Sequence, residues 1–328
     1  MFDADLSLVP TQSRVLVAVS GGADSLALLV WLLELGREVV AGHVNHALDE
    51  LRNGDCARDE AWLGARCAEL RVAFRSQTIE LPRRNGHVNE AVARTGRYAA
   101  LEQMARDNQC PVLATAHTAS DALEGMILNL GRGAGIRGLS GFSPSRELEG
   151  DLILVRPFWR LGRDEVRAWL LERGGTWLED ASNQSEVFRR NRVRGEVMPL
   201  LSSIFGREGD ELAHGFALNA QLARDEDAWL EQQSLEALES LVTKREEGAL
   251  ALDGLTFRAL PIALQRRVLR LAARQIEPGV REVERVKIET LRLACTQNTR
   301  RGVWTWRKVL RVEWTGDQAG NRLRFWRV

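Results

Sequence analysis

The sequence predicts an α/β fold: a doubly wound, mostly parallel five-stranded sheet, followed by a smaller, mainly helical domain with a short β-hairpin end. Two observations support this prediction. Up to residue 155, apolar runs of strand length alternate with longer segments whose apolar residues recur at helical spacing. Such alternation implies right-handed crossovers and a parallel sheet covered on both faces. Beyond that point the pattern becomes helical, and residues 301–328 alternate again in the manner of strands.

The expected elements follow one another in a regular order. Strands are predicted at 14–19, 38–44, 72–79, 111–116 and 152–155. The helices between them are predicted at 24–35, 55–70, 89–106 and 120–130. Later helices are predicted at 163–173, 187–201, 209–241 and 260–274, and glycine-rich turns near 316 and 320 predict the hairpin. We place the domain boundary near Phe205 and Gly206, which gives domains 1–205 and 206–328.

The composition excludes several classes of protein. With 45% hydrophobic and 27% charged residues, the 328-residue chain resembles an average soluble protein. Its longest apolar run, 26–33, is far shorter than the roughly 20 residues that span a bilayer, and its acidic start is no signal peptide. We therefore expect a cytoplasmic protein without membrane contact. The four cysteines form no C-x-x-C pair, which disfavours zinc and iron–sulfur sites.

Lysine is scarce in this chain. Only three of the 45 basic residues are lysines, and the first of them is Lys244. A Walker A loop needs a lysine that reaches the β and γ phosphates, so the first two-thirds of the chain cannot contain one. A phosphate site in the predicted sheet must use backbone amides and arginines instead.

The segment from Ser20 to Ser25, Ser-Gly-Gly-Ala-Asp-Ser, joins the first predicted strand to a leucine-rich helix. Two glycines let the backbone turn sharply, and successive amides at a helix N-terminus favour a bound phosphate. The serines add hydroxyl donors, and Asp24 suits a magnesium ion held on that phosphate. The alternative is an ordinary turn in which Ser20 or Asp24 caps the helix. The segment is not G-x-G-x-x-G, which disfavours a dinucleotide-dependent oxidoreductase.

A second group of candidate residues follows the fourth predicted strand. His117 ends that strand, and Asp121 and Glu124 lie on one face of the next helix. Ligands of doubly wound sheets bind at the carboxyl ends of the strands, where the strand order reverses. If the order is 3-2-1-4-5, this group faces the segment 20–25 across one crevice. Its carboxylates could bind magnesium or an ammonium group, or they could simply reflect the preference of acids for helix N-termini.

The Ser-Gly-Gly-x-Asp-Ser loop resembles the signature of the N-type ATP pyrophosphatase, or PP-loop, superfamily. Further stretches narrow the resemblance to the family of the tRNA(Ile)-lysidine synthases. They run in the family's order between about residues 14 and 201: 43–48, 89–98, 116–124, 129–133, 156–157, 179–183, and 190–194 with Pro199. The combination is far more specific than any single motif, and it implies an adenine-nucleotide-hydrolase-like sheet.

The resemblance implies a ligase that forms C–N bonds. With ATP and Mg²⁺, such an enzyme attaches free L-lysine to the wobble cytidine of tRNA(Ile) with a CAU anticodon, through an adenylated cytidine, and releases AMP and pyrophosphate. Residues 1–205 would form the ATP-binding catalytic domain, and residues 206–328 would form an appended tRNA-binding domain. A homodimer is also implied.

The resemblance assigns roles to individual residues. ATP would contact Ser20, Gly21, Gly22, Ala23, Asp24, Ser25 and His43. Catalysis would involve Asp24, Arg97, His117, Asp121 and Glu124, with Asp24 and Asp121 as metal ligands. RNA or phosphate would contact Arg132, Arg190 and Arg194, since arginine binds phosphate bidentately, although runs of arginine are most often solvated helix faces. A metal pair of His43 with His46 is disfavoured because no third ligand has suitable spacing.

Around the second group the sequence departs from the family. The common pattern has two histidines, two adjacent aspartates and a threonine after the glutamate, and here Thr118, Ser120 and Gly125 stand in those places. Ala122 replaces a usual glutamine. These departures leave open whether a second carboxylate shares the metal.

Two other functions stay open. A PP-loop enzyme could thiolate tRNA, but sulfur transfer usually needs a reactive cysteine or a cluster. A non-catalytic nucleotide- or RNA-binding module has only the departures at Ser120 and Gly125 in its favour. The tryptophans and arginines after residue 300 fit cross-strand packing, and they also suit single-stranded RNA.

Overall fold

The computed structural model describes residues 2–45, 55–80, 83–84, 87–88, 90–179, 189–207, 209–278, 285–297, 301–306, 308–317 and 320–328. Parts of the motifs named above lie outside these ranges, namely residues 46–48, 89 and 180–183. By its contacts the chain forms two compact units, Met1–Arg224 and Asp225–Val328. Each unit has a hydrophobic core of its own.

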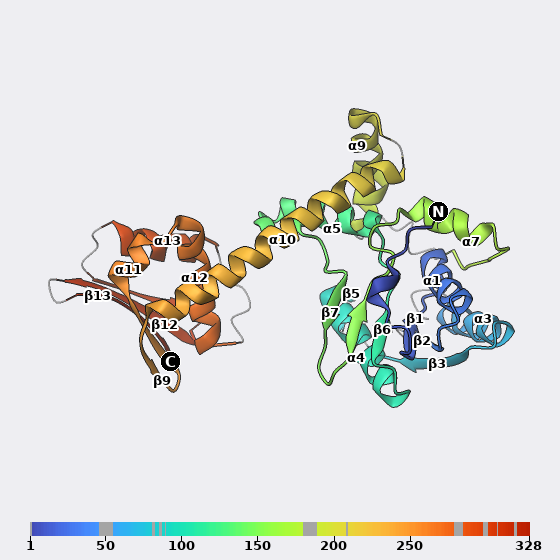
Figure 1. Cartoon of the computed structure of the whole chain (residues 1–328), viewed down its shortest axis with the longest axis horizontal. Helices are drawn as coiled ribbons and strands as arrows, with labels where there is room; N and C mark the ends of the chain where they lie inside the picture. Colours follow the sequence, from blue (N-terminus) through green and yellow to red (C-terminus); the bar gives the residue numbers. More distant parts are fainter. Residues whose placement is uncertain are drawn as a thin grey trace. The chain divides into compact units, whose positions relative to one another are not determined.

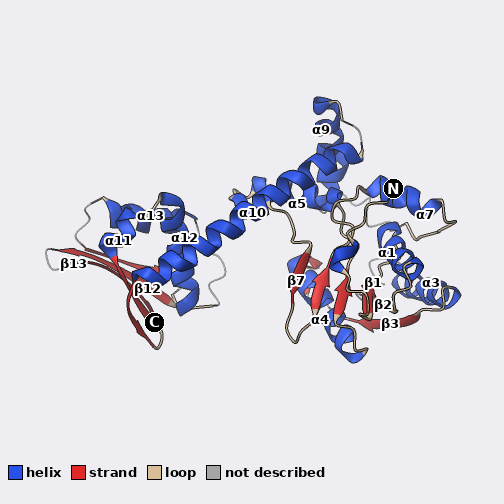
Figure 2. Cartoon of the chain, in the orientation of Figure 1, coloured by secondary structure: helices blue, strands red, loops and turns tan. Residues whose placement is uncertain are grey.

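The first unit is built on a six-stranded sheet (Figures 1 and 2). Its strand order is β3(Ala73–Thr78), β2(Val39–Asn45), β1(Val15–Ala18), β6(Val112–Ala114), β8(Ile153–Val155) and β7(Ser145–Glu147). The first five strands are parallel to their neighbours and are the five predicted strands, in the order 3-2-1-4-5. The sixth, β7, pairs antiparallel at the edge. Its residues are all exposed and carry no apolar pattern, so the sequence did not predict it.

Helices cover both faces of this sheet, because successive strand residues point to opposite sides. Val15 and Val17 of β1 pack into one core with α1(Ala23–Glu34), α3(Asp55–Glu69) and α7(Arg163–Leu171). Leu16, between them, belongs to a second core with α4(Glu90–Asp107). Burial of each such side chain contributes about 2 kcal/mol. The doubly wound α/β class is therefore confirmed.

After β6 come α5(Ala119–Gly131) and the short α6(Ile136–Leu139). The helix predicted at 187–201 is interrupted: α8(Arg189–Arg192) passes into a π-helical turn, η3(Val193–Val197), and then into α9(Met198–Phe205). Pro199 lies in the first turn of α9, where its missing N–H costs nothing. The unit also contains η1(Leu6–Leu8), β4(Arg83–Arg84) and β5(His87–Val88).

The long helix α10(Asp210–Leu241) begins in the first unit and ends in the second. Ala213 and Ala217 pack on α5, whereas Leu241 belongs to the core of the second unit. The contacts therefore divide the chain at Arg224 and Asp225, inside this helix. The predicted boundary at 205–206 marks the end of α9, which is a turn but not the limit of a packing unit. No helix in the described part of the chain, α10 included, is long and apolar enough to cross a membrane.

The second unit holds an antiparallel sheet in the order β11(Arg301–Trp306), β12(Leu310–Asp317), β13(Gly320–Arg327), β10(Ala249–Asp253) and β9(Val242–Glu246). Three helices pack on it, α11(Gly254–Ala259), α12(Ile262–Ile276) and α13(Arg285–Thr296). Trp306 and Trp314 are fully buried there, so packing accounts for two of the four tryptophans of the tail. The predicted hairpin lies within a larger sheet. The sequence did not predict β9, because it directly follows a helical pattern and is largely exposed.

Candidate functional site

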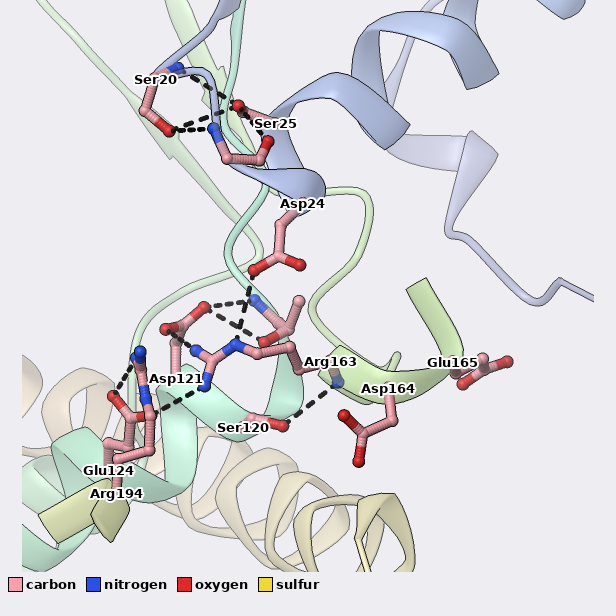
Figure 3. Close-up of polar contacts among 12 residues, drawn as sticks. Ser20, Asp24, Ser25, Ser120, Asp121, Glu124, Arg163, Asp164, Glu165 and Arg194 are labelled. Carbon is pink, nitrogen blue, oxygen red and sulfur yellow. Dashed lines mark hydrogen bonds and ion pairs between the residues drawn. The ribbon is translucent and has the colours of Figure 1, made fainter. Parts of the chain in front are cut away.

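The segment 20–25 forms a tight loop between β1 and α1, at the carboxyl end of the sheet (Figure 3). The Ser25 hydroxyl donates to the Gly22 carbonyl (2.9 Å) and accepts from the Ser20 amide (3.2 Å). Gly22 is the N-cap residue of α1, and no side chain caps this helix. The capping alternative for Ser20 and Asp24 is therefore wrong. The first amides of α1 have no side-chain acceptor and can bind an anion.

A second backbone segment lies against this loop. The Leu178 amide donates to the Gly21 carbonyl at 2.9 Å. Gly21 adopts a left-handed φ of +92°, and a Cβ there would lie 2.9 Å from Cδ1 of Leu178. The left-handed conformation therefore favours glycine at this position, and a Cβ would in addition displace the end of the Leu178 side chain.

The acidic residues lie at the start of α5, which follows the strand that neighbours β1. Oδ2 of Asp121 accepts from the amide (2.9 Å) and the hydroxyl (3.1 Å) of Thr118, as in a capping box. The helix-terminus alternative thus accounts for one carboxylate oxygen. The other oxygen of Asp121, and the carboxylate of Glu124, make contacts that capping does not explain.

Arg163, the first residue of α7, joins the two predicted groups (Figure 3). Its Nη2 lies 2.9 Å from Asp121 Oδ1, its Nη1 3.2 Å from Glu124 Oε1, and its Nε 3.5 Å from Asp24 Oδ2. Asp24 of the segment 20–25, called the phosphate loop from here on for its predicted role, therefore meets the acids of α5 around one guanidinium. Sequence analysis missed Arg163, because an arginine in the first turn of a helix carries no local signal of its role.

Glu124 is held by a second arginine. Its side chain is only 2% exposed, and Arg194 of η3 binds it through Nε (2.8 Å to Oε1) and Nη2 (3.2 Å to Oε2). A buried carboxylate needs such partners, because its removal from water costs several kcal/mol. Arg194 therefore pairs with Glu124 here, and its predicted contact with RNA or phosphate stays a prediction.

His117 lies just after β6. Its Nδ1 is 2.9 Å from the hydroxyl oxygen of Thr115, and its ring packs against Phe142 with centroids 5.4 Å apart. Burial lowers the pKa of His117 to about 3 despite the nearby charge of Asp121, and three arginines add to the effect: Arg156, Arg94 and Arg97. His117 is therefore neutral at neutral pH. The charge of Arg97 thus acts on His117, and the predicted role of Arg97 in catalysis stays a prediction.

The other predicted residues lie around this centre or apart from it. His43 is buried on β2, with Nδ1 2.9 Å from the carbonyl of Val19 at the exit of β1. Arg190 lies half-buried on α8. Arg132 is exposed at the opposite end of α5 from Asp121 and donates to Asn129 (2.6 Å). The contact of Arg132 with RNA stays a prediction.

Asp24 and Asp121 have opposite electrostatic environments. Burial, together with the charge of Asp121, raises the pKa of Asp24 to about 6 against the opposing effect of Arg163. For Asp121, burial is outweighed by the charge of Arg163 and the hydrogen bond from the Thr118 amide, which hold the pKa of its carboxyl below the usual range. Oδ1 of Asp24 is buried and has no hydrogen-bond partner among the described residues. Ionised Asp24 therefore lacks compensation that a cation could supply.

The donor set at Asp24 fits a magnesium ion. Mg²⁺ prefers oxygen ligands and usually takes one or two carboxylates, with phosphate oxygens and waters as the rest. Asp24 lies in the segment 20–25, and its carboxylate points toward Arg163 (Figure 3). Among the described residues, no three His, Cys, Asp or Glu side chains form a preformed metal cage. A metal bound here would therefore take most of its ligands from phosphate oxygens and water.

Comparison with known proteins identifies the class. The sequence profile of the PP-loop domain, an ATP-binding family, matches residues 3–201, more than half of the chain. The solved structure of a U34-tRNA thiolase from Methanococcus maripaludis, with its 4Fe–4S cluster, superposes with a TM-score of 0.52. The match covers 68% of this chain and 74% of that chain at 16% sequence identity, so it shows the shared fold alone.

Curated relatives narrow the class further. The tRNA(Ile)-lysidine synthases of Gloeobacter violaceus and of a Synechococcus strain are 37% and 36% identical to this chain over 269 residues, and the chain covers 78% and 77% of them. That of Porphyromonas gingivalis is 41% identical over 193 residues, and the chain covers 41% of its length. The chain belongs to the tRNA(Ile)-lysidine synthase family of PP-loop proteins. The family predicted from the sequence is therefore confirmed.

Replacing Gly21 by Ala is expected to lower the free energy of unfolding by roughly 1–2 kcal/mol, because a left-handed φ disfavours a Cβ and Leu178 leaves it little room. Gly22→Ala is the matched control, since its φ is −74° and its Cβ would meet only Ser20 Oγ, at 3.6 Å. Urea unfolding of both variants measures the difference. Equal losses in the two variants would contradict the prediction.

In the nucleotide-free protein, Asp24→Asn is expected to stabilise the fold at about pH 8 but not at about pH 4. A carboxyl whose pKa rises from 3.8 to about 6 on folding stabilises the fold in its protonated form. That stability is full below pH 3.8 and is lost as the pH rises through 6. The gain has an upper limit of about 3 kcal/mol. Urea titrations across this range test it, and a difference between variant and wild type that stays constant with pH would refute it.

Proposed function

We propose that this protein is an ATP-dependent ligase that attaches L-lysine to the wobble cytidine of tRNA(Ile) with a CAU anticodon. The products would be lysidine, AMP and pyrophosphate. One observation carries the proposal: the phosphate-loop residue Asp24 meets Asp121 and Glu124 around a single guanidinium. The loop proposed to bind phosphate and the acids proposed to bind a cationic group therefore lie together. The names of the curated relatives supply the identity of the tRNA and of the product.

In the first step, the 2-oxo oxygen of the cytidine would attack the α-phosphate of ATP, and the bond to pyrophosphate would break. The amides at the start of α1 and the hydroxyl of Ser20 would bind the departing pyrophosphate, where negative charge grows. The Ser25 hydroxyl, which donates to the Gly22 carbonyl, would join them only by giving up that bond. Arg97 would face the α-phosphate. Asp24, with Asp121 nearby, would hold Mg²⁺, which neutralises phosphate charge when bound.

In the second step, the ε-amine of lysine would attack carbon 2 of the cytosine, and AMP would leave. Lysine arrives as an ammonium ion, which Asp121 and Glu124 would bind through charge-assisted hydrogen bonds. One of these carboxylates would take the proton that the amine must lose before it attacks. His117 is kept neutral by burial, so it can accept a hydrogen bond from the amine without repelling the ammonium. The two steps would thus use two kinds of group at one edge of the sheet, hydrogen-bond donors for phosphate and acceptors for the amine.

The second unit offers a surface for RNA. Along β13, buried Leu323 and Phe325 alternate with exposed Arg322 and Arg324, because successive strand residues face opposite sides. The neighbouring strand β12 adds exposed Arg311, and half-buried Glu313 and Thr315 lie opposite Arg324 and Arg322. An arginine-bearing sheet face suits phosphate backbone, which supports residues 206–328 as the appended tRNA-binding part.

A homodimer is a further proposal, and sedimentation of the purified protein would test it.

Thiolation is less well supported by the residues of this chain. All four cysteines are buried. Burial raises the pKa of Cys67 to about 11 and that of Cys295 to about 12, so these thiols are poor nucleophiles.

A non-catalytic module is also disfavoured. Ser120 accepts a hydrogen bond from the Arg163 amide at 3.3 Å, and nothing crowds Gly125, so neither departure dismantles the site.

The purified protein is expected to release AMP and pyrophosphate from ATP only when both L-lysine and unmodified tRNA(Ile) with a CAU anticodon are present. Norleucine, which lacks the ammonium group, should not replace lysine. Mass spectrometry of the digested tRNA should show lysidine. Pyrophosphate release that is absent, or that is indifferent to lysine, would contradict the proposal.

Asp121→Asn and Glu124→Gln are each expected to lower kcat/KM for lysine by on the order of 100-fold, the cost of one lost charge-assisted contact in a dry site. Asp164→Asn is the matched control, because Asp164 is an exposed carboxylate on the first turn of α7 and lies outside the cluster around Arg163. Steady-state kinetics with lysine as the varied substrate give the comparison. A similar loss in the control would count against specific roles for the two acids.

A further inference from the structure

Arg163 contacts more carboxylates than an ordinary ion pair does. Each of its three guanidinium nitrogens pairs with a different carboxylate: Nε with Asp24, Nη2 with Asp121 and Nη1 with Glu124. Its side chain is 14% exposed, so the pairs are largely shielded from water. Such pairs are strong only when the geometry is good and both partners are present. The three acids are thus held by one internal cation.

The backbone of Arg163 is fixed from two sides. Its amide donates to Ser120 Oγ of α5 at 3.3 Å. The next two amides of α7 donate to Asp210 at the start of α10, at 3.3 Å from Asp164 and 2.7 Å from Glu165. Gly162, the N-cap residue, has no room for a Cβ because Asp210 packs directly against it. With the backbone held in this way, only the side chain of Arg163 is free to change its contacts.

The contacts of Arg163 coincide with those that an external cation would need. In the proposed function, a divalent ion uses Asp24 and Asp121, and the ammonium group of lysine uses Asp121 and Glu124. The guanidinium now lies at hydrogen-bond or ion-pair distance from all of these carboxylates. The described residues contain no ready cage of three metal-binding side chains, which fits acids arranged around an arginine. An entering cation must therefore compete with Arg163 or share the carboxylates with it.

We propose that Arg163 is a positioning residue that acts as an internal counter-cation. It holds the three carboxylates in place in the nucleotide-free enzyme, suppresses the binding of free cations there, and shifts its side chain when a divalent ion or an ammonium group enters. The identity of these cations rests on the proposed function, but the competition itself does not. Arg194 remains on Glu124 throughout, so removal of Arg163 leaves one positive charge for three acids.

The proposal is tested with Arg163→Met in the full-length, nucleotide-free protein, because methionine keeps an unbranched stem and removes the charge. Mn²⁺ binding, followed by electron paramagnetic resonance, is expected to be at least about tenfold tighter in this variant than in wild type, as unpaired carboxylates attract the ion. Mn²⁺ should also raise the Tm of the variant more than that of wild type, since a ligand of the folded state stabilises it. A second arm replaces Mn²⁺ by L-lysine, with norleucine as its control, and distinguishes an ammonium ligand from a metal.

Arg173→Met is the matched control, because Arg173 follows the same helix but pairs with Glu34 and stacks on Trp169. It should leave Mn²⁺ affinity unchanged. If Arg163→Met does not fold, Arg163→Lys replaces it. Its Mn²⁺ affinity is expected to exceed that of wild type by less than about tenfold, since lysine keeps the charge but cannot span three acids. Unchanged Mn²⁺ and lysine binding in the folded Arg163 variant, or an equal gain in Arg173→Met, would overturn the proposal. Neither tRNA nor ATP is used, so failure of lysidine formation would be a separate result.

Discussion

The site depends on the parallel pairing of β6 with β1. These two strands are neighbours in the sheet although α1, β2, α3, β3 and α4 separate them along the chain. Parallel neighbours end at the same edge, so the loop after β1 and the helix after β6 must lie side by side. This constraint alone brings the amides of the phosphate loop to the acids of α5. The first turn of α7 then adds Arg163, which links the two groups.

Electrostatics at this edge are balanced for an enzyme without its ligands. Glu124 is satisfied by two arginines, and Asp121 by a capping box and Arg163. Asp24 is the exception, with an unpaired buried oxygen and a pKa raised to about 6. Residues that cost stability in the free protein and gain partners on binding are typical of functional sites. Asp24 is therefore the proposed principal ligand of the metal, and Asp121 lies beside it as the second carboxylate.

The sequence predicted the parallel sheet, its strand order and the family because these depend on local patterns and on one contiguous loop. Apolar runs such as Arg14–Val19 predict strands directly, and the six residues Ser20–Ser25 are enough to predict a phosphate-binding loop. Arg163 was missed because its role arises from three segments that are distant in sequence. The edge strand β7 and the strand β9 carry exposed side chains and so lack a periodic signal. The division inside α10 was missed because a helix can continue from one packing unit into the next without a change in its pattern.

The most direct test of the account is a crystal structure of the protein with Mn²⁺ and a non-hydrolysable ATP analogue, in which anomalous scattering locates the metal. The account predicts that the β and γ phosphates lie on the amides of residues 21–25 and that the metal contacts Asp24. It also predicts that the side chain of Arg163 no longer bridges all three carboxylates. A nucleotide bound elsewhere, or a metal remote from Asp24 with Arg163 unmoved, would contradict it.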